Sequence, residues 1–181
     1  MTPIPSFAAA AAAWQNFYVL AGTASATLIG LMFVAITFGA SLVTPETSFS
    51  ARSFLDPTFT HFVQVLLTAC LITIPTMGPT VLGVLLLAIS ALRTSALFRV
   101  FRHMREAHRI HHDIELSDWL TGIAIPLLCY LLLAATGAAF LEGLRGAFDV
   151  LAIVTIAILL NGIYGAWELI LWMALARARA K

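Results

Sequence analysis

Apolar residues occur along this chain in long runs of the kind that predict membrane-spanning helices. Five such runs are separated by short stretches that carry turn residues or charge. A helix needs about 20 mostly apolar residues to cross a bilayer, and each run is close to that length or longer. The pattern predicts an all-α integral membrane bundle of five spans. The expected spans are residues 14–43, 57–75, 79–98, 117–141 and 148–176.

The apolar stretch over residues 62–98 is too long for a single span. As one helix it would measure about 55 Å, against a hydrocarbon core of about 30 Å. Pro75, Gly78 and Pro79 interrupt it, and proline breaks the interior of a helix. We therefore expect two spans joined by a tight turn. A re-entrant hairpin that does not cross is the alternative.

Local sequence predicts where two of the spans begin. Asp56 is a suitable cap for the second span, and Pro57 suits a first helical turn, where no backbone N–H partner is missed. Ser117 is a suitable cap for the fourth span. The stretch before Trp14 carries no Lys or Arg, so it does not read as a cleaved signal peptide.

The positions of the basic residues predict the orientation. With five spans, the first and third loops and the C-terminal tail share one side of the membrane. That side holds Arg52, Arg99, Arg102, Arg105, Arg109, Arg177, Arg179 and Lys181, and the other holds Arg145. Because cytoplasmic loops carry the excess of basic residues, we expect the N-terminus outside and the C-terminus inside.

Composition supports a single transmembrane domain, residues 1–181, and narrows the functions. Hydrophobic residues make up 61% of the 181 residues and charged residues 10%. The only lysine, Lys181, is terminal, which excludes a Schiff base within the membrane. Catalytic motifs are not evident, and no spacing matches a named metal site. We therefore expect no enzyme activity, no cofactor and no metal site, and Cys70 and Cys129 are expected to be small buried apolar residues.

Polar residues on three spans fall at a similar depth near the predicted inner surface. At 1.5 Å per residue, they lie about 6–10 Å inside the inner ends of their helices. Their spacing places them on one side of each helix, where they must face other helices or water. We interpret the layer as an ion or proton path, or as a buried Arg93–Glu168 pair that only fixes packing. The candidates are Glu168, His61, Arg93, Gln64, Tyr164 and Asn161.

Small residues form a face on the first span. Gly22, Ala26 and Gly30 recur every four residues, a pattern that lets helix backbones approach closely. Thr23 and Thr27 add hydroxyl groups that can bond between helices. The face is expected to pack inside the protomer or between protomers, with pore lining as the alternative.

The first span also carries a resemblance. Trp14, Phe17 and Tyr18, followed by the run ATLIGLMFVA from Ala26, resemble the opening of a group of small, functionally uncharacterised bacterial multi-spanning membrane proteins. The resemblance covers about one sixth of the chain and implies the bacterial inner membrane. It transfers no site residue.

A basic, histidine-rich segment over residues 99–113 is expected to extend the third span as an amphipathic helix. Its first interpretation is contact with anionic lipid headgroups, worth about 1 kcal/mol per basic residue. Histidines crowded among arginines also fit pH sensing, and His108, His112 and Glu115 share a spacing that would suit a metal. The candidates for lipid contact or pH sensing are Arg99, Arg102, His103, Arg105, His108, Arg109, His111 and His112.

The leading hypothesis is a homo-oligomeric channel or transporter for a small inorganic ion, embedded in the lipid bilayer. Closed cyclic symmetry is the usual form of such an assembly. The alternative is a non-conducting accessory or regulatory subunit that binds a larger membrane complex through the first span. Nucleic acid is not an expected partner, because the basic segment lacks aromatic residues spaced for base stacking.

Overall fold

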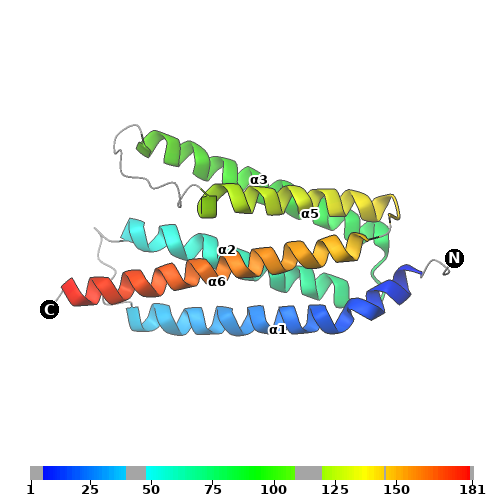
Figure 1. The fold of residues 1–181 in the computed structure, drawn as a ribbon, viewed down its shortest axis with the longest axis horizontal. Coiled ribbons are helices and arrows are strands. Elements are labelled where there is room, and N and C mark those ends of the chain that lie inside the picture. The colour runs from blue at the N-terminus through cyan, green and yellow to red at the C-terminus, as the bar shows by residue number, and fades with distance from the viewer. Residues whose placement is uncertain (1–5, 40–47, 109–119, 145, 180–181) are drawn as a thin grey trace.

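The computed structural model contains five long helices (Figure 1). It describes residues 6–39, 48–108, 120–144 and 146–179. The backbone alone is described at residues 48–55, 99–108, 120–121, 176 and 178–179. The elements are α1 (Phe7–Gly39), α2 (Ser48–Thr73), α3 (Pro79–His108), the π-helical turn η2 (Leu120–Ala124), α5 (Ile125–Leu141) and α6 (Ala147–Arg179).

The five helices run alternately in opposite directions along one bundle (Figure 1). The C-terminal ends of α1, α3 and α6 lie at one end of the bundle, together with the start of α2. This alternation is the arrangement on which the charge argument rests. It places Arg52, Arg99, Arg102 and Arg105 toward the same end as Arg177.

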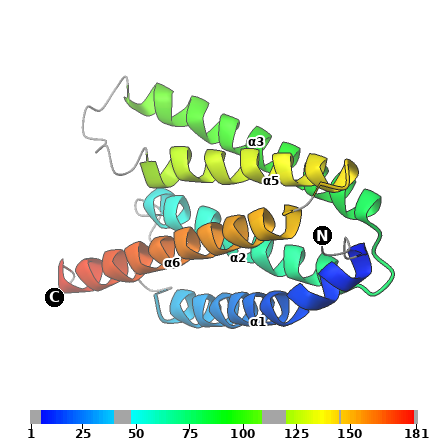
Figure 2. The ribbon, with the colours of Figure 1, turned by 45° about the vertical axis from the view of Figure 1, so that its right-hand side comes forward.

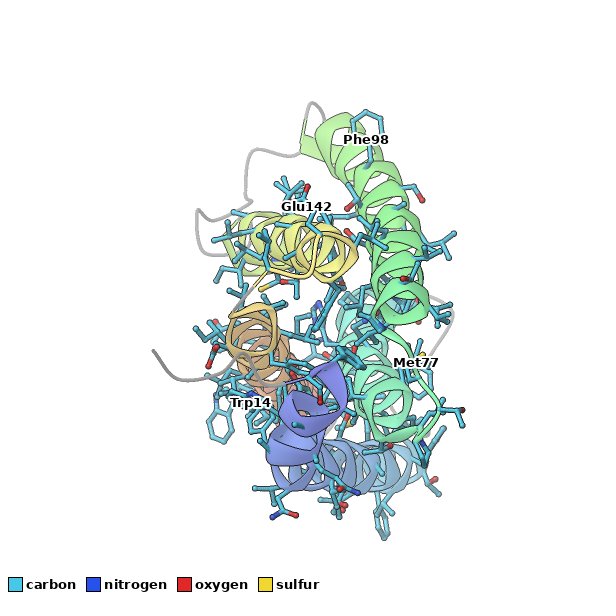
Figure 3. All side chains as sticks on the ribbon, turned by 90° about the vertical axis from the view of Figure 1, so that its right-hand side faces the viewer. Trp14, Met77, Phe98 and Glu142 are labelled. Atoms are coloured by element: carbon cyan, nitrogen blue, oxygen red, sulfur yellow. The ribbon has the colours of Figure 1, made fainter. Side chains whose placement is uncertain are left out.

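The helices form two groups that pack against each other. In one group, α3 lies along α5; in the other, α2 packs between α1 and α6. The contact between α5 and α6 joins the groups, whereas α3 touches α2 little. Figures 2 and 3 show α2 and α6 lying between the α3–α5 pair and α1.

The predicted start of the second span is wrong. Helix α2 begins at Ser48, so Asp56 and Pro57 lie inside it rather than at its first turn. A proline inside a helix leaves one carbonyl without its usual N–H donor, at a cost of about 3 kcal/mol. The packing of the whole helix therefore outweighs the local preference of Asp56-Pro57 for a helix start. The other end agrees with the prediction, because α2 ends at Thr73 and α3 begins at Pro79.

The predicted cap of the fourth span, Ser117, lies outside the described residues. The described part opens with the wide turn η2, followed by Pro126 in the first turn of α5. A proline ring clashes with the carbonyl four residues earlier, here that of Gly122. The wider π turn relieves this clash.

The other ends differ from the predicted spans by a few residues. Helix α1 begins at Phe7, and α6 covers Ala147–Arg179.

The turn between α5 and α6 depends on glycine. Gly143 has a φ of 65°, in the left-handed region that favours glycine. The Leu144 N–H donates to the Ala139 carbonyl at 2.9 Å, and the Gly143 N–H donates to the Phe140 carbonyl at 3.3 Å. These two bonds form the glycine-terminated helix end that caps the last carbonyls of α5.

Four helices in the described part of the chain are long and apolar enough to cross a membrane. They are α1, the Pro79–Phe98 part of α3, Gly122–Leu141 and the Ala147–Leu175 part of α6. Their large apolar side chains are widely exposed, for example Leu20 at 70%, Leu92 at 69% and Leu160 at 60%. Exposed apolar surface on this scale is typical of a helical membrane protein. The second predicted span, on α2, is not apolar enough over its described residues to be counted with these four.

Candidate functional site: a buried polar layer

Helix α2 carries a stripe of polar side chains that is buried in the bundle. Thr58, His61, Gln64 and Thr68 recur every three or four residues, which places them on one helical face. None of the four is more than 5% exposed. The polar face of α2 therefore points into the protein. This inward polarity is why α2 is less apolar than its neighbours.

Arg93 of α3 reaches this stripe from the other helix group. Its Nε donates to Gln64 Oε1 at 3.3 Å. The Gln64 Nε2 donates in turn to Thr68 Oγ1 at 3.2 Å, and Thr68 Oγ1 donates to the Gln64 carbonyl at 2.9 Å. The two polar atoms of the Gln64 amide are thus both used, which fixes its orientation toward Arg93. This chain of bonds connects the α3–α5 pair to the α1–α2–α6 group.

His61 faces helix α6. Its Nδ1 lies 3.5 Å from Asn161 Nδ2, at the long end of the hydrogen-bond range. An amide nitrogen only donates, so the contact requires the His61 tautomer that carries its proton on Nε2. The structure therefore brings together His61, Gln64, Arg93 and Asn161 from three helices.

Glu168 does not join Arg93. In the described part of the chain no ion pair is formed by Glu168, and the hydrogen bond of Arg93 goes to the neutral Gln64 amide. The reason is the packing, because α3 lies along α5 and makes little contact with α6. Glu168 is half-buried, and Tyr164, on the same face of α6, is 44% exposed. The buried Arg93–Glu168 pair expected as a packing lock is not present.

Two glycines that the sequence argument passed over set the closeness of α2 and α6. A Cβ added at Gly162 would lie 2.8 Å from the Phe62 ring, and one at Gly165 would collide with Thr58 Oγ1. Contacts this short would force the Phe62 ring or the Thr58 side chain to move, because protein interiors are close-packed. The pair Gly162 and Gly165, spaced three apart on α6, was the sequence signal for this contact. It brings the polar stripe of α2 against α6.

Two buried serines, also missed, tie helices together. Ser25 Oγ of α1 donates to the Phe62 carbonyl of α2 at 2.5 Å, and Ser90 Oγ of α3 donates to the Tyr130 carbonyl of α5 at 2.6 Å. Serine hydroxyls commonly form such bonds between membrane helices. A serine inside an apolar run is therefore a useful signal, although sequence alone does not identify its partner.

The small-residue face of α1 divides between the inside and the outside of the protomer. Gly22 is buried, and a Cβ there would lie 2.9 Å from the Cβ of Ala69 on α2. Thr23, Ala26, Thr27 and Gly30 are exposed, and a Cβ at Gly30 would meet nothing within 4 Å. Gly22 therefore packs inside the protomer against α2. For the other four residues, contact between protomers and pore lining stay predictions.

The basic segment continues α3 as a helix through His108, as expected. The side chains of Arg99, Arg102, His103, Arg105 and His108 are not described. Arg109, His111 and His112 lie outside the described residues, together with Glu115 of the possible metal group. Within the described part of the chain, no group of three or more His, Cys, Asp or Glu side chains is placed to hold a metal ion.

The tail contributes one contact that charge patterning alone did not predict. Arg177 Nη2 of α6 donates to the Phe38 carbonyl near the end of α1 at 2.9 Å. The last carbonyls of a helix lack partners within it, so a guanidinium is a suitable cap.

Of the cysteines, Cys129 is buried as expected, but Cys70 is exposed on α2.

The hydroxyl of Tyr18 is the buried side-chain polar atom that lacks a well-formed hydrogen bond among the described residues. Tyr18 is fully buried among the core side chains of α1, α2, α5 and α6. Its ring packs edge-on against Phe17, with centroids 4.9 Å apart. Its hydroxyl lies beside the Thr155 side chain of α6 but forms no hydrogen bond of good geometry. The ring therefore contributes mainly apolar packing.

Comparison of the chain with known protein families, with curated proteins and with solved structures finds no match. The resemblance of the first span to small bacterial membrane proteins therefore stays a prediction. The geometry of the polar layer is the basis for any functional argument.

Proposed function

We propose that this protein is a homo-oligomeric channel or transporter for a small inorganic ion, with the polar layer as its gate or binding site. The observation that carries the proposal is the layer itself. Three helices place hydrogen-bonding side chains beside one another, those of α2 fully buried. One of them is the half-buried guanidinium of Arg93, which has no carboxylate partner among the described residues. Ionisable groups inside a membrane are costly and mark ion pathways in many proteins.

The proposal includes α2 as a fifth span. Its 26 residues would measure about 39 Å, enough to cross a core of about 30 Å. Helices α1 and α6 cover much of its polar face, so α2 does not need the apolar exterior that a lipid-facing helix requires. With five spans, the excess of basic residues favours the N-terminus outside and the C-terminus inside a bacterial inner membrane. The polar layer then lies toward the cytoplasmic side.

The absence of an Arg93–Glu168 pair weakens the interpretation of the layer as a packing lock. A buried lock needs a partner of opposite charge, because an unpaired buried charge destabilises the fold. Arg93 instead keeps a net positive charge beside neutral groups. The Arg93–Gln64 bond joins two helix groups, but among the described residues no opposite charge balances the guanidinium. An unbalanced charge inside a membrane is common at functional sites.

A second function has its own support. The exposed face formed by Thr23, Ala26, Thr27 and Gly30 suits close contact with another helix. In a homo-oligomer that helix belongs to a second copy of the chain. In an accessory subunit it belongs to a different membrane protein, and the chain by itself carries no ion.

Ion flux through liposomes that contain the purified protein tests the proposal. The informative variant is Arg93→Gln, which removes the charge of the layer. Its matched control is Arg177→Gln, which removes the same charge at the end of α6, outside the layer. We expect flux from the wild-type protein and from Arg177→Gln, and a loss of at least about tenfold in Arg93→Gln.

The purified protein is also sized in detergent. Flux together with a single symmetric assembly supports the proposed function. A folded protein that carries none of several cations and anions, and that co-purifies with another membrane protein, supports the accessory subunit instead.

A further inference from the structure

Arg93 holds its positive charge in a setting that leaves it open to a ligand. The side chain is half-buried on the Pro79–Phe98 part of α3, the part that is apolar enough to cross a membrane. Its hydrogen bond to Gln64 uses Nε. The two terminal nitrogens, Nη1 and Nη2, make no hydrogen bond to the described part of the chain and are not sealed from the surface.

The described groups around the guanidinium do not neutralise it. Gln64 and Thr68 are neutral and are bonded to each other. Helix α6, which carries Glu168, makes little contact with α3, and no described carboxylate is paired with Arg93. A cation in surroundings of low dielectric attracts a negative ion far more strongly than the same cation in water.

We propose that Arg93 and Gln64 form a binding site for a small monovalent anion. Gln64 orients the guanidinium through Nε, and the pair of Nη donors faces the ion. This fork matches two oxygens of a planar oxyanion, so nitrate is a suitable probe. The inference rests on the proposed function in one respect: the anion that binds here is the ion that the protein carries.

Equilibrium binding of nitrate to the purified protein in detergent, measured by calorimetry, tests the site without reference to transport. Wild type and Arg177→Gln should bind alike, because Arg177 is remote from the layer. Arg93→Gln should lower the affinity by about tenfold or more, since hydrogen bonds to charged groups contribute about 1.5–3 kcal/mol.

Gln64→Glu is the second variant, and it keeps the size and shape of the side chain. It places a carboxylate at the position now held by the amide oxygen, 3.3 Å from Arg93 Nε. The internal carboxylate neutralises the guanidinium and pairs with it, so the protein should stay folded while nitrate binding falls by about tenfold or more. Equal nitrate affinity in wild type, Arg93→Gln and Gln64→Glu overturns the site, as does the absence of nitrate binding to folded wild type.

Flux measurements separate this inference from the proposed function. Nitrate binding that depends on Arg93, in a protein without flux, supports the site and contradicts the transport proposal. Selective cation flux in a protein that does not bind nitrate supports transport and contradicts the anion site.

Discussion

Helix α2 and the other four helices differ in the side chains that they bury and expose. Helices α1, α3, α5 and α6 expose many large apolar side chains. Over the residues of α2 whose side chains are described, few large apolar side chains are exposed and four polar ones are buried. The four apolar helices follow the rule for a helix in lipid. Helix α2 follows the rule for polar groups in a membrane, which must face other helices or water. Low hydropathy in one helix of such a bundle therefore indicates that its polar face packs against neighbouring helices.

The largest loss of stability is expected at a glycine contact between two of the apolar helices, α3 and α5. Gly83 of α3 and Gly137 of α5 face each other, and a Cβ at Gly83 would lie 2.7 Å from the Gly137 carbonyl oxygen. Backbone atoms cannot move aside as side chains do. Gly83→Leu should therefore lower the free energy of unfolding by about 3 kcal/mol or more. Reversible unfolding in detergent measures it.

The matched control for Gly83→Leu is Gly30→Leu, at a position open to the surroundings of the protomer. It should leave the unfolding of the protomer almost unchanged. If the exposed face of α1 joins copies of the chain, Gly30→Leu should instead reduce the oligomer seen by size analysis. Equal destabilisation by the two substitutions would contradict the assigned faces of α1 and α3.

The polar stripe of α2 gives the next largest effect. Gln64→Leu removes the acceptor of the Arg93 hydrogen bond and leaves the guanidinium without that partner. We expect a loss of about 2 kcal/mol in the free energy of unfolding. Leu67→Ala, on the more exposed side of the same helix, should cost less than about 1 kcal/mol because little packing is lost. A larger loss at Leu67 than at Gln64 would reverse the proposed sidedness of α2.

A pair of hydroxyl residues on α1 sharpens the comparison between inside and outside. Ser25 bonds across to the Phe62 carbonyl of α2, whereas the exposed Thr27 bonds only to the Thr23 carbonyl of its own helix. Ser25→Ala should lower the free energy of unfolding by about 1 kcal/mol, and Thr27→Ala should leave it nearly unchanged. Thermal unfolding of both variants provides the measurement, and the reverse order would refute the packing of α1 on α2.

The smallest effect is expected at Tyr18. Its hydroxyl is buried beside Thr155 without a hydrogen bond of good geometry, so Tyr18→Phe removes a desolvated polar group while keeping the ring. Stability should stay the same or rise by up to about 1 kcal/mol. A clear loss of stability in the same thermal assay would show that the hydroxyl has a partner in the membrane.

The sequence predicted the elements better than their contacts. Long apolar runs placed all five helices, and the turn at Pro75, Gly78 and Pro79 was correct because prolines there interrupt a run too long for one span. The start of α2 was wrong because Asp56-Pro57 reads locally as a helix start, while tertiary packing carries the helix through it.

The polar layer was predicted in outline but not in its pairing. Depth along each helix depends only on the rise per residue, so bringing Gln64 near the level of Arg93 needed no tertiary information. Which helices pack together does need it. The expected Arg93–Glu168 pair failed because α3 lies along α5 rather than α6, and no local pattern of either helix specifies that choice.

The central claim is that the polar layer lines a path open to water, and one pair of cysteine substitutions tests it directly. In a background where Cys70 and Cys129 are replaced by alanine, Asn161→Cys places a thiol in the layer, and Leu160→Cys places one on the exposed apolar side at the same depth. The rate of labelling by a water-soluble, membrane-impermeant thiol reagent is measured in membranes. The account predicts rapid labelling of Asn161→Cys and little labelling of Leu160→Cys. Absence of labelling at both positions in folded protein would show a dry layer and contradict an ion path.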